Sequence, residues 1–409
     1  MVQSTKNHQK CYFAGMKIPR HILPVIVIAQ FCCTSLWFAG NAVMADLVVD
    51  FSLPVSALGN LTSAVQFGFI TGTLLFALLT IADRFSPAKV FFVCALLGAL
   101  FNVVSIGAYN TPFTLLLLRF LMGCSLAGIY PVGMKIAADY YAQGLGKSLG
   151  YLVGALVLGT AFPHLLQAFS GDWPWRYVLL VTSGLALLGG TLMLVLVPDG
   201  PHRRAGQGLD VGAFFSVFKD RSFRAAAFGY FGHMWELYAF WAFVPVALLA
   251  YSELHPAAGF SIPVLSFVII GIGSLACVLG GYLSLRFGAR KIAAVALALS
   301  GCCCLLSPLF FLYTSSLVFA SFLVFWGMVV VADSPLFSTL VAQNAPAEKK
   351  GTALTIVNCL GFSITILSIQ LLNYLQLEVV PAYLFLVLAV GPVLGLWGLL
   401  RGRLQSTKL

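Results

Sequence analysis

The chain has 409 residues, of which 60% are hydrophobic and only 9% carry a charge. A soluble domain contains roughly a quarter charged residues, so this composition excludes a soluble globular protein and indicates many membrane-spanning segments. The ten cysteines lie mostly inside apolar runs, where a thiol behaves as a small apolar group. Their spacing matches no metal site, and we expect neither a metal nor another cofactor.

Twelve apolar runs are long enough to cross a bilayer as helices, which takes about twenty residues each. Runs of this length do not alternate with a period of two, so transmembrane strands are excluded. In chain order the predicted spans are 22–48, 57–82, 88–108, 112–138, 147–170, 175–198, 223–251, 261–285, 291–313, 315–342, 351–375 and 380–400.

The longest polar stretch divides these spans into six and six, which predicts five parts of the chain. They are a cytoplasmic tail at 1–21, a first six-helix bundle at 22–198, a cytoplasmic central loop at 199–222, a second six-helix bundle at 223–400 and a cytoplasmic tail at 401–409. The first tail is polar and basic and lacks a cleavage site, so it is not interpreted as a signal peptide.

The basic residues predict the orientation. Of the 23 lysines and arginines, all but Arg119 and Arg176 fall in the tails, in the central loop or beside the loops that follow even-numbered spans. By the positive-inside rule these segments face the cytoplasm. The same placement accounts for the net charge of +10 without a nucleic-acid partner.

Each half of the chain carries a short basic loop after its second span. These loops are DRFSPAKV at 83–90 and LRFGARKI at 285–292. Internal repeats of this kind are typical of transporters in which two bundles enclose a site near the membrane midplane. The predicted fold class is therefore an all-α membrane protein with twelve transmembrane helices in two pseudo-symmetric six-helix bundles.

The second loop, within GGYLSLRFGARK, resembles the loop motif of the major facilitator superfamily, Gly-x-Leu-x-Asp-Arg-x-Gly-Arg-Lys, although Leu285 replaces the acid. The first loop keeps Asp83, Arg84 and Lys89 of this motif but lacks its glycines. In span 4, RFLMG at 119–123 has the Arg-x-x-x-Gly spacing of a second motif of the family. The resemblance covers essentially the whole chain.

The resemblance implies alternating access, in which two bundles rock about a central cavity lined by spans 1, 4, 7 and 10. It also implies that the basic loops gate this motion. The predicted gating residues are Asp83, Arg84, Lys89, Arg286, Gly288, Arg290 and Lys291. Proton-driven exporters of the superfamily tend to carry a glycine–proline motif in span 5. Here AFPHLLQAF has the proline without the glycines, which disfavours drug export.

Charged residues inside spans are costly and are functional by default. Arg119 in span 4 and Asp46 in span 1 lie at matching depths. They could form a structural ion pair that braces two helices. Alternatively, Arg119 binds an anionic solute or relays protons, because its charge is fixed.

Span 7 holds a histidine and a glutamate in the stretch HMWELYAFW. At 100° per residue, His233, Glu236 and Phe240 share one helical face and Tyr238 lies on the opposite one. The resemblance points the Glu236 face at the cavity. We predict that Glu236 is the proton-coupling acid, assisted by His233, Asp46 and Arg119. The alternative is a neutral glutamic acid that only hydrogen-bonds another helix.

Other polar and aromatic side chains on these spans are candidate solute contacts, although most aromatics in membrane proteins pack or lie at interfaces. In span 10, Asp333 lies two residues before Pro335, so it either caps the interrupted helix or binds the solute. The predicted solute-binding residues are Arg119, Asn41, Trp37, Tyr130, Glu236, Phe240, Trp241, Asp333 and Asn358.

The leading functional hypothesis is a secondary active transporter that takes up a small polar solute, with anions among the candidates, in symport with protons. A proton-driven exporter and a non-transporting solute sensor are the alternatives. An intramembrane enzyme is disfavoured because His-x-x-Glu at 233–236 has no second ligand cluster to complete a metal site. The expected location is the plasma membrane, as a bacterial inner-membrane monomer whose partners are the solute, protons and lipid.

Overall fold

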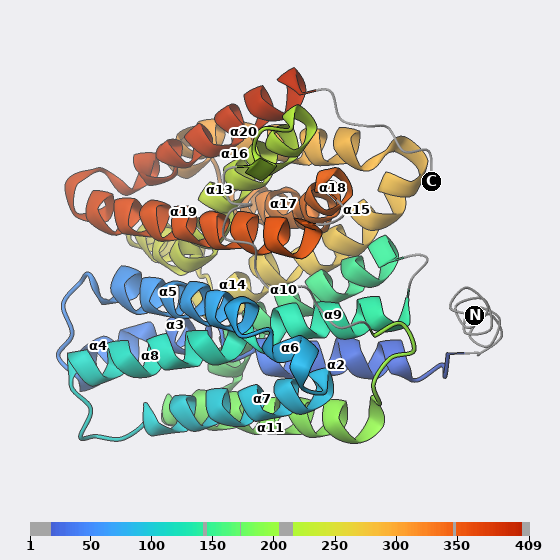
Figure 1. Cartoon of the computed structure of the whole chain (residues 1–409). Helices are drawn as coiled ribbons and strands as arrows, with labels where there is room; N and C mark the ends of the chain where they lie inside the picture. The colour runs from blue at the N-terminus through green and yellow to red at the C-terminus, as the bar shows by residue number, and fades with distance from the viewer. Residues whose placement is uncertain (1–17, 142–144, 172, 204–215, 347–348, 403–409) are drawn as a thin grey trace, which may run out of the picture.

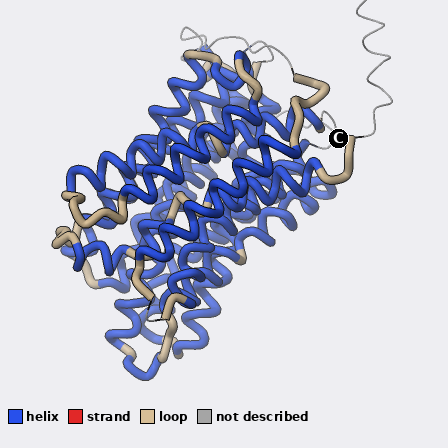
Figure 2. The backbone as a smooth tube through the Cα atoms, turned by 90° about the horizontal axis from the view of Figure 1, so that it is seen from below, coloured by secondary structure: helices blue, strands red, loops and turns tan. Residues whose placement is uncertain are grey.

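The computed structural model describes residues 18–141, 145–171, 173–203, 216–346 and 349–402. Throughout these residues the regular structure is helical and no strand occurs (Figure 2). Most of the two predicted tails and half of the predicted central loop lie outside the described residues.

In the first bundle, span 1 consists of three consecutive helices and span 4 of two. The helices are α2 (Ile22–Thr34), α3 (Ala39–Ala42), α4 (Met44–Asp50), α5 (Ala57–Leu78), α6 (Ile81–Arg84), α7 (Pro87–Val104), α8 (Pro112–Ala127), α9 (Tyr130–Tyr140), α10 (Leu145–Phe169) and α11 (Arg176–Leu196).

In the second bundle, spans 8, 10 and 12 are divided. The helices are α13 (Arg221–Leu254), η1 (Pro256–Ala258), α14 (Ile262–Gly271), α15 (Gly273–Phe287), α16 (Ala289–Tyr313), α17 (Ser316–Ala332), α18 (Ser334–Asn344), α19 (Lys350–Glu378), η3 (Pro381–Ala389) and α20 (Val390–Arg401).

The span count agrees with hydropathy. Among the described residues, 11 helical segments are long and apolar enough to cross a membrane. Span 1 adds a further one, because it begins with the shorter apolar helix α2 and continues through α3 and α4. In Figure 1 the first bundle, blue to green, lies below the second, yellow-green to red. The predicted class, twelve transmembrane helices in two six-helix bundles, is confirmed.

Spans 4 and 10 are interrupted at corresponding places in the two halves. In span 4, α8 gives way to α9 at Gly128 and Ile129, and Pro131 lies in the first turn of α9. In span 10, α17 gives way to α18 at Asp333, and Pro335 lies in the first turn of α18. Proline has no amide hydrogen and clashes with the preceding turn, so it interrupts a helix.

Glycines allow neighbouring spans to approach at backbone distance. A Cβ atom added at Gly68 of α5 would collide with the carbonyl oxygen of Phe120 in α8, and one at Gly123 of α8 would collide with the carbonyl oxygen of Val65. In the second bundle, Gly232 of α13 packs in the same way against α20. Small residues at such crossings are what drives helix association in a bilayer.

The two sides of the molecule are distinct. The terminal side is defined here as the side where α2 begins and α20 ends; the opposite side carries the start of α5 and the end of α19 (Figure 1). Two seams join the bundles, one between α10 and α14–α15 and the other between α5 and α19.

Candidate functional site

A small cavity lies between the bundles, beside the interruptions in spans 4 and 10. Its volume is about 40 Å³. Both bundles contribute to it, through α9 and α10 on one side and α13, α17, α18 and α19 on the other. The residues that line this central cavity are Tyr130, Met134, Val153, Leu156, Tyr230, Met234, Leu237, Tyr238, Trp241, Val331, Ser334, Ser338, Asn358 and Phe362.

None of these lining side chains is charged. Tyr230 donates a hydrogen bond from its hydroxyl to Oδ1 of Asn358, at 3.1 Å. Trp241 is fully buried, and its indole N–H has no acceptor among the described residues. The central cavity therefore offers aromatic surface and hydrogen-bonding groups but no formal charge.

An aromatic cluster separates the central cavity from the opposite side. It consists of Trp37, Phe69, Tyr238 and Phe362. The Trp37 ring stacks on Tyr238 at 5.7 Å and on Phe362 at 5.8 Å between centroids, and Phe69 lies 4.4 Å from Phe362. Because Trp37 and Phe69 belong to the first bundle and the other two rings to the second, the cluster spans the gap between them.

Beyond this cluster, an amide latch joins α5 to α19. Gln370 donates to Oγ of Ser63 at 2.9 Å and to Oδ1 of Asn60 at 3.3 Å. Asn373 accepts from the amide of Gly59 at 3.3 Å and donates to the carbonyl of Ser56 at 3.2 Å. These contacts close the α5–α19 seam on the opposite side without any ion pair.

On the terminal side the same seam is open. A cavity of about 300 Å³, the vestibule, separates the last turns of α5, together with α6 and α9, from the start of α19. Asp83 and Lys135 line one wall, and Gly351 and Thr355 line the other. The α5–α19 seam is thus closed on the opposite side and open on the terminal side.

Glu236 lies inside the second bundle, fully buried. Its Oε1 accepts from the indole N–H of Trp326 at 2.7 Å and from the thiol of Cys304 at 3.4 Å. Its Oε2 lies 2.9 Å from the hydroxyl of Ser300, which also lies 3.1 Å from the carbonyl oxygen of Leu297. The carboxyl group thus meets three donors and no cation.

The prediction that the Glu236 face of span 7 lines the cavity is wrong. The cavity is lined by the Tyr238 face of α13, whereas Glu236 and Phe240 point toward other helices of their own bundle. Phe240 packs on Trp326 with ring centroids 4.6 Å apart. The rotation of α13 is set by its glycine contact with α20, made by Gly232.

His233, also in span 7, forms a buried polar contact with Asp333. Its Nδ1 lies 2.8 Å from Oδ1 of Asp333, and both side chains are 1% exposed. Asp333 occupies the interruption between α17 and α18, but its side chain makes no cap hydrogen bond there. Its carboxyl group is therefore committed to His233 rather than to the helix end. His233 is paired with Asp333, not with Glu236.

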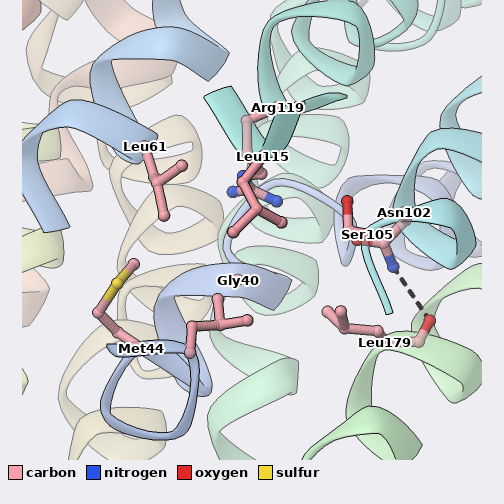
Figure 3. A pocket seen from close by; sticks show the side chains of 9 residues that line it. Gly40, Met44, Leu61, Asn102, Ser105, Leu115, Arg119 and Leu179 are labelled. Atoms are coloured by element: carbon pink, nitrogen blue, oxygen red, sulfur yellow. Dashed lines mark hydrogen bonds between the residues drawn. The ribbon is translucent and has the colours of Figure 1, made fainter. Parts of the chain in front are cut away.

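Arg119 lies within the first bundle, beside a separate cavity of about 10 Å³ (Figure 3). Its Nη2 donates to the carbonyl oxygen of Trp37 at 2.8 Å, and Nη1 lies 3.5 Å from the sulfur of Met122. Trp37 lies in the break after α2, where its carbonyl oxygen lacks a helical partner, and the guanidinium of Arg119 supplies a hydrogen bond to it. It lies close against Gly40 of α3.

The Asp46–Arg119 ion pair, one of the two alternatives for these residues, is not formed. Asp46 instead accepts a hydrogen bond from Gln167 of α10, at 3.3 Å. Matching depth was the only basis for the pair, and depth does not determine which way two side chains point. Asn41 also stays within the first bundle, where it donates to Thr62 at 2.8 Å.

The predicted solute contacts therefore separate into two groups. Tyr130, Trp241 and Asn358 line the central cavity, and Trp37 belongs to the aromatic cluster beside it. The others do not line the cavity; these are Arg119, Asn41, Glu236, Phe240 and Asp333.

The two repeated loops make different contacts. In the first, Asp83 pairs with Lys135 of α9 at 3.0 Å. In the second, Arg290 donates to the carbonyl oxygens of Leu399 and Gly402 at 2.7 Å each, at the end of α20. Gly288 has φ +87° between α15 and α16, a conformation that side chains disfavour. A cation at a helix C-terminus also complements the helix dipole.

The central cavity also includes residues that the sequence did not single out. Tyr230, Met234, Ser334, Ser338 and Phe362 line it. The interruptions at Pro131 and Pro335, in corresponding spans of the two halves, are the signal that could have located the cavity. Among the described residues, no group of His, Cys, Asp and Glu side chains could hold a metal ion.

A chain of two six-helix bundles with a cavity between them has the architecture of a polytopic membrane transporter. The profile of the Major Facilitator Superfamily matches residues 26–369, and the chain belongs to this family. Its fold is similar to that of the proton:xylose symporter XylE bound to 6-bromo-6-deoxy-D-glucose, with a TM-score of 0.72, 14% identity, and coverage of 92% of this chain and 94% of that one.

Three curated relatives match a smaller part of this chain than the symporter structure does. The Probable sulfoacetate transporter SauU of Cupriavidus necator is 24% identical over 46% of this chain and 43% of its own length. The Uncharacterized transporter YgaY of Escherichia coli O157:H7 is 24% identical over 50% and 52%. Protein spinster homolog 1 of Xenopus laevis is 27% identical over 44% and 35%. The chain spans about half the length of these relatives or less.

Proposed function

We propose that the protein is a secondary active transporter that moves a small organic solute across the membrane by alternating access. The observation that carries this proposal is the asymmetry of the α5–α19 seam, which an amide latch closes on the opposite side while the vestibule of about 300 Å³ opens it on the terminal side. A cavity between two bundles that is accessible from one side at a time is what alternating access requires.

The proposed driving force is a proton gradient, coupled through Glu236. A buried carboxyl group with no cation beside it is costly when charged, yet the groups around Glu236 suit both protonation states. When the carboxyl group is ionised, Ser300 donates to Oε2. When it is protonated, Glu236 donates to Ser300, whose own hydrogen turns to the carbonyl oxygen of Leu297, because a hydroxyl has one hydrogen and two acceptor sites.

Coupling then runs through α13. Glu236 ties this helix to α16 and α17 through Ser300 and Trp326, while the opposite face of the same helix lines the central cavity through Tyr230 and Met234. A change in the protonation state of Glu236 alters the attachment of α13 to its own bundle. It thereby biases the position of the face that meets the solute. The His233–Asp333 pair is a second buried polar contact that joins α13 to the rest of its bundle.

The basic loops are proposed to gate the terminal side. Asp83 faces the start of α19 across the vestibule, and an acid is attracted to the N-terminus of a helix. Closing the vestibule would bring the two together. We further propose that the terminal side is cytoplasmic, that transport is uptake, and that the protein acts as a monomer in a bacterial inner membrane.

The experiment is proton movement in proteoliposomes that contain the dye pyranine. A panel of sugars, amino acids, carboxylates and aromatic amides is added outside, and acidification of the lumen reports symport. We expect Glu236→Gln, which keeps the shape of the side chain but cannot titrate, to abolish this acidification while retaining solute counterflow. Glu253→Gln, at the exposed end of the same helix, is the matched control. Acidification by the Glu236→Gln protein at the wild-type rate would refute the coupling role.

A further inference from the structure

We propose that the central cavity takes an uncharged solute that combines a flat apolar ring with a hydrogen-bond acceptor, such as an amide or ketone carbonyl. This inference rests on the proposed transport function, because it assumes that the cavity between the bundles is where the solute binds. It narrows the solute from a small organic molecule of any charge to a neutral aromatic one.

The first argument is the aromatic surface of the cavity. Tyr130, Tyr230, Tyr238, Trp241 and Phe362 all line it, and each is at most 9% exposed. The first comes from the first bundle and the other four from the second, so rings meet an occupant from both sides. Aromatic rings favour stacked or edge-on contact with another ring. A flat ring therefore gains contacts that a compact polyol does not.

The second argument is charge. No lining residue of the central cavity carries a formal charge. His233, Asp333 and Glu236 do not line it: His233 lies against Asp333, and Glu236 faces Trp326 and Ser300. A carboxylate or an ammonium group would leave water without a counter-ion. Cation–π attraction offsets part of this cost for an ammonium group only, so the experiment includes an amine.

The third argument is a buried hydrogen-bond donor without an acceptor. The buried indole N–H of Trp241 has no acceptor among the described residues. Tyr230 occupies one of the two lone pairs of the amide oxygen of Asn358, and the amide nitrogen of Asn358 is a second donor at the cavity. An indole and an amide nitrogen only donate. A solute that satisfies them must contribute an acceptor.

The cavity is small in this conformation, at about 40 Å³, and two of its lining side chains, Met134 and Met234, are unbranched. Methionine adapts its shape more readily than other apolar residues. Movement of these two side chains widens the cavity without displacing a helix. A single ring with one short substituent is the smallest solute of the proposed class, and it requires this widening.

The experiment measures binding to the purified full-length protein with matched probes. Benzamide, nicotinamide and pyrazinamide are each compared with the corresponding carboxylate and aminomethyl compound, by thermal shift and by quenching of tryptophan fluorescence. We expect each amide to bind at least tenfold more tightly than its charged counterparts. Trp241→Phe should weaken amide binding about three- to tenfold, the loss of one hydrogen bond, and leave toluene binding unchanged. Trp173→Phe, on the exposed surface, is the matched control.

Equal or tighter binding of the carboxylates or the amines, or no binding by any amide, would overturn the proposal. Because the charge comparison is made on the wild-type protein, it stands even if Trp241→Phe fails to fold. Amide binding that is never followed by transport would count against the transporter and leave the solute class intact. Proton-coupled transport of a carboxylate would support the transporter and count against the neutral solute class.

Discussion

At the scale of single residues, Trp326 offers the sharpest test of the Glu236 environment. Its indole N–H can only donate, so it favours the ionised carboxyl group. We expect Trp326→Phe to move the pH midpoint of solute-driven proton uptake upward by about one unit, the effect of one hydrogen bond to a charged group. The measurement is the pH profile of pyranine acidification. A profile that stays in place, or moves to lower pH, would show that Trp326 does not hold the charged form.

Arg119 and Asp46 provide a second test at this scale. Arg119 binds the carbonyl oxygen of Trp37, whereas Asp46 meets only an amide at 3.3 Å. Arg119→Lys should lower the thermal unfolding temperature by several degrees, because lysine lacks the planar fork. Asp46→Asn should change it by about one degree at most. Were the two residues an ion pair, neutralising Asp46 would leave a lone buried charge at a cost of about 3–5 kcal/mol, and the unfolding temperature would fall far more.

The sequence predicted which residues matter in span 7 but not what they face. Helical periodicity gives the angle between Glu236 and Tyr238, and it placed them correctly on opposite faces. It does not give the rotation of the helix relative to its neighbours. That rotation depends on contacts distant in sequence, such as Gly232 against α20 and Ser300 against Glu236.

At the scale of elements, the α5–α8 crossing depends on two reciprocal glycines. A methyl group at Gly68 or Gly123 would strike the backbone of the other helix, which cannot move without shifting the whole span. We expect Gly68→Ala to destabilise the protein by about 1–3 kcal/mol, as overpacking does, measured by thermal unfolding in detergent. The control is Gly184→Ala in α11, where an added Cβ meets nothing within 4 Å. Equal stability of the two variants would contradict this account of the crossing.

Some interruptions of the spans could be predicted and others could not. Pro131 and Pro335 mark the breaks in spans 4 and 10 directly in the sequence. Span 1 breaks between α2 and α3 with no proline in the segment 35–38. The carbonyl oxygen of Trp37 there is satisfied by Arg119 from a different span. A break that depends on a tertiary contact leaves no local signal.

At the scale of the whole molecule, the distribution of basic residues predicts which side is cytoplasmic. In a protein without its native cysteines, we expect His202→Cys, on the terminal side, to resist a membrane-impermeant maleimide added to intact cells. Tyr109→Cys, on the opposite side, should react, since Tyr109 is 75% exposed. The reverse pattern of labelling would invert the orientation and, with it, the proposed direction of transport.

The overall architecture was largely readable from hydropathy, because a bilayer requires about twenty apolar residues for each helical span. Which side of the α5–α19 seam is closed could not be predicted from the sequence. Closure of the α5–α19 seam depends on Gln370 and Asn373 meeting Ser63 and Gly59 across the two bundles. Amides of this kind serve equally well within a bundle, so their sequence positions carry no information about which side is closed.

The central claim, alternating access, is tested most directly by distances measured with pairs of spin labels across the α5–α19 seam. One pair, Val55 and Leu377, reports the opposite side, where both side chains are exposed. The other, Ala77 and Thr355, reports the vestibule side. As solute and protons are added to the protein in liposomes, we predict that a population appears in which the first distance lengthens and the second shortens. Two distances that stay fixed, or that change in the same direction, would contradict the account.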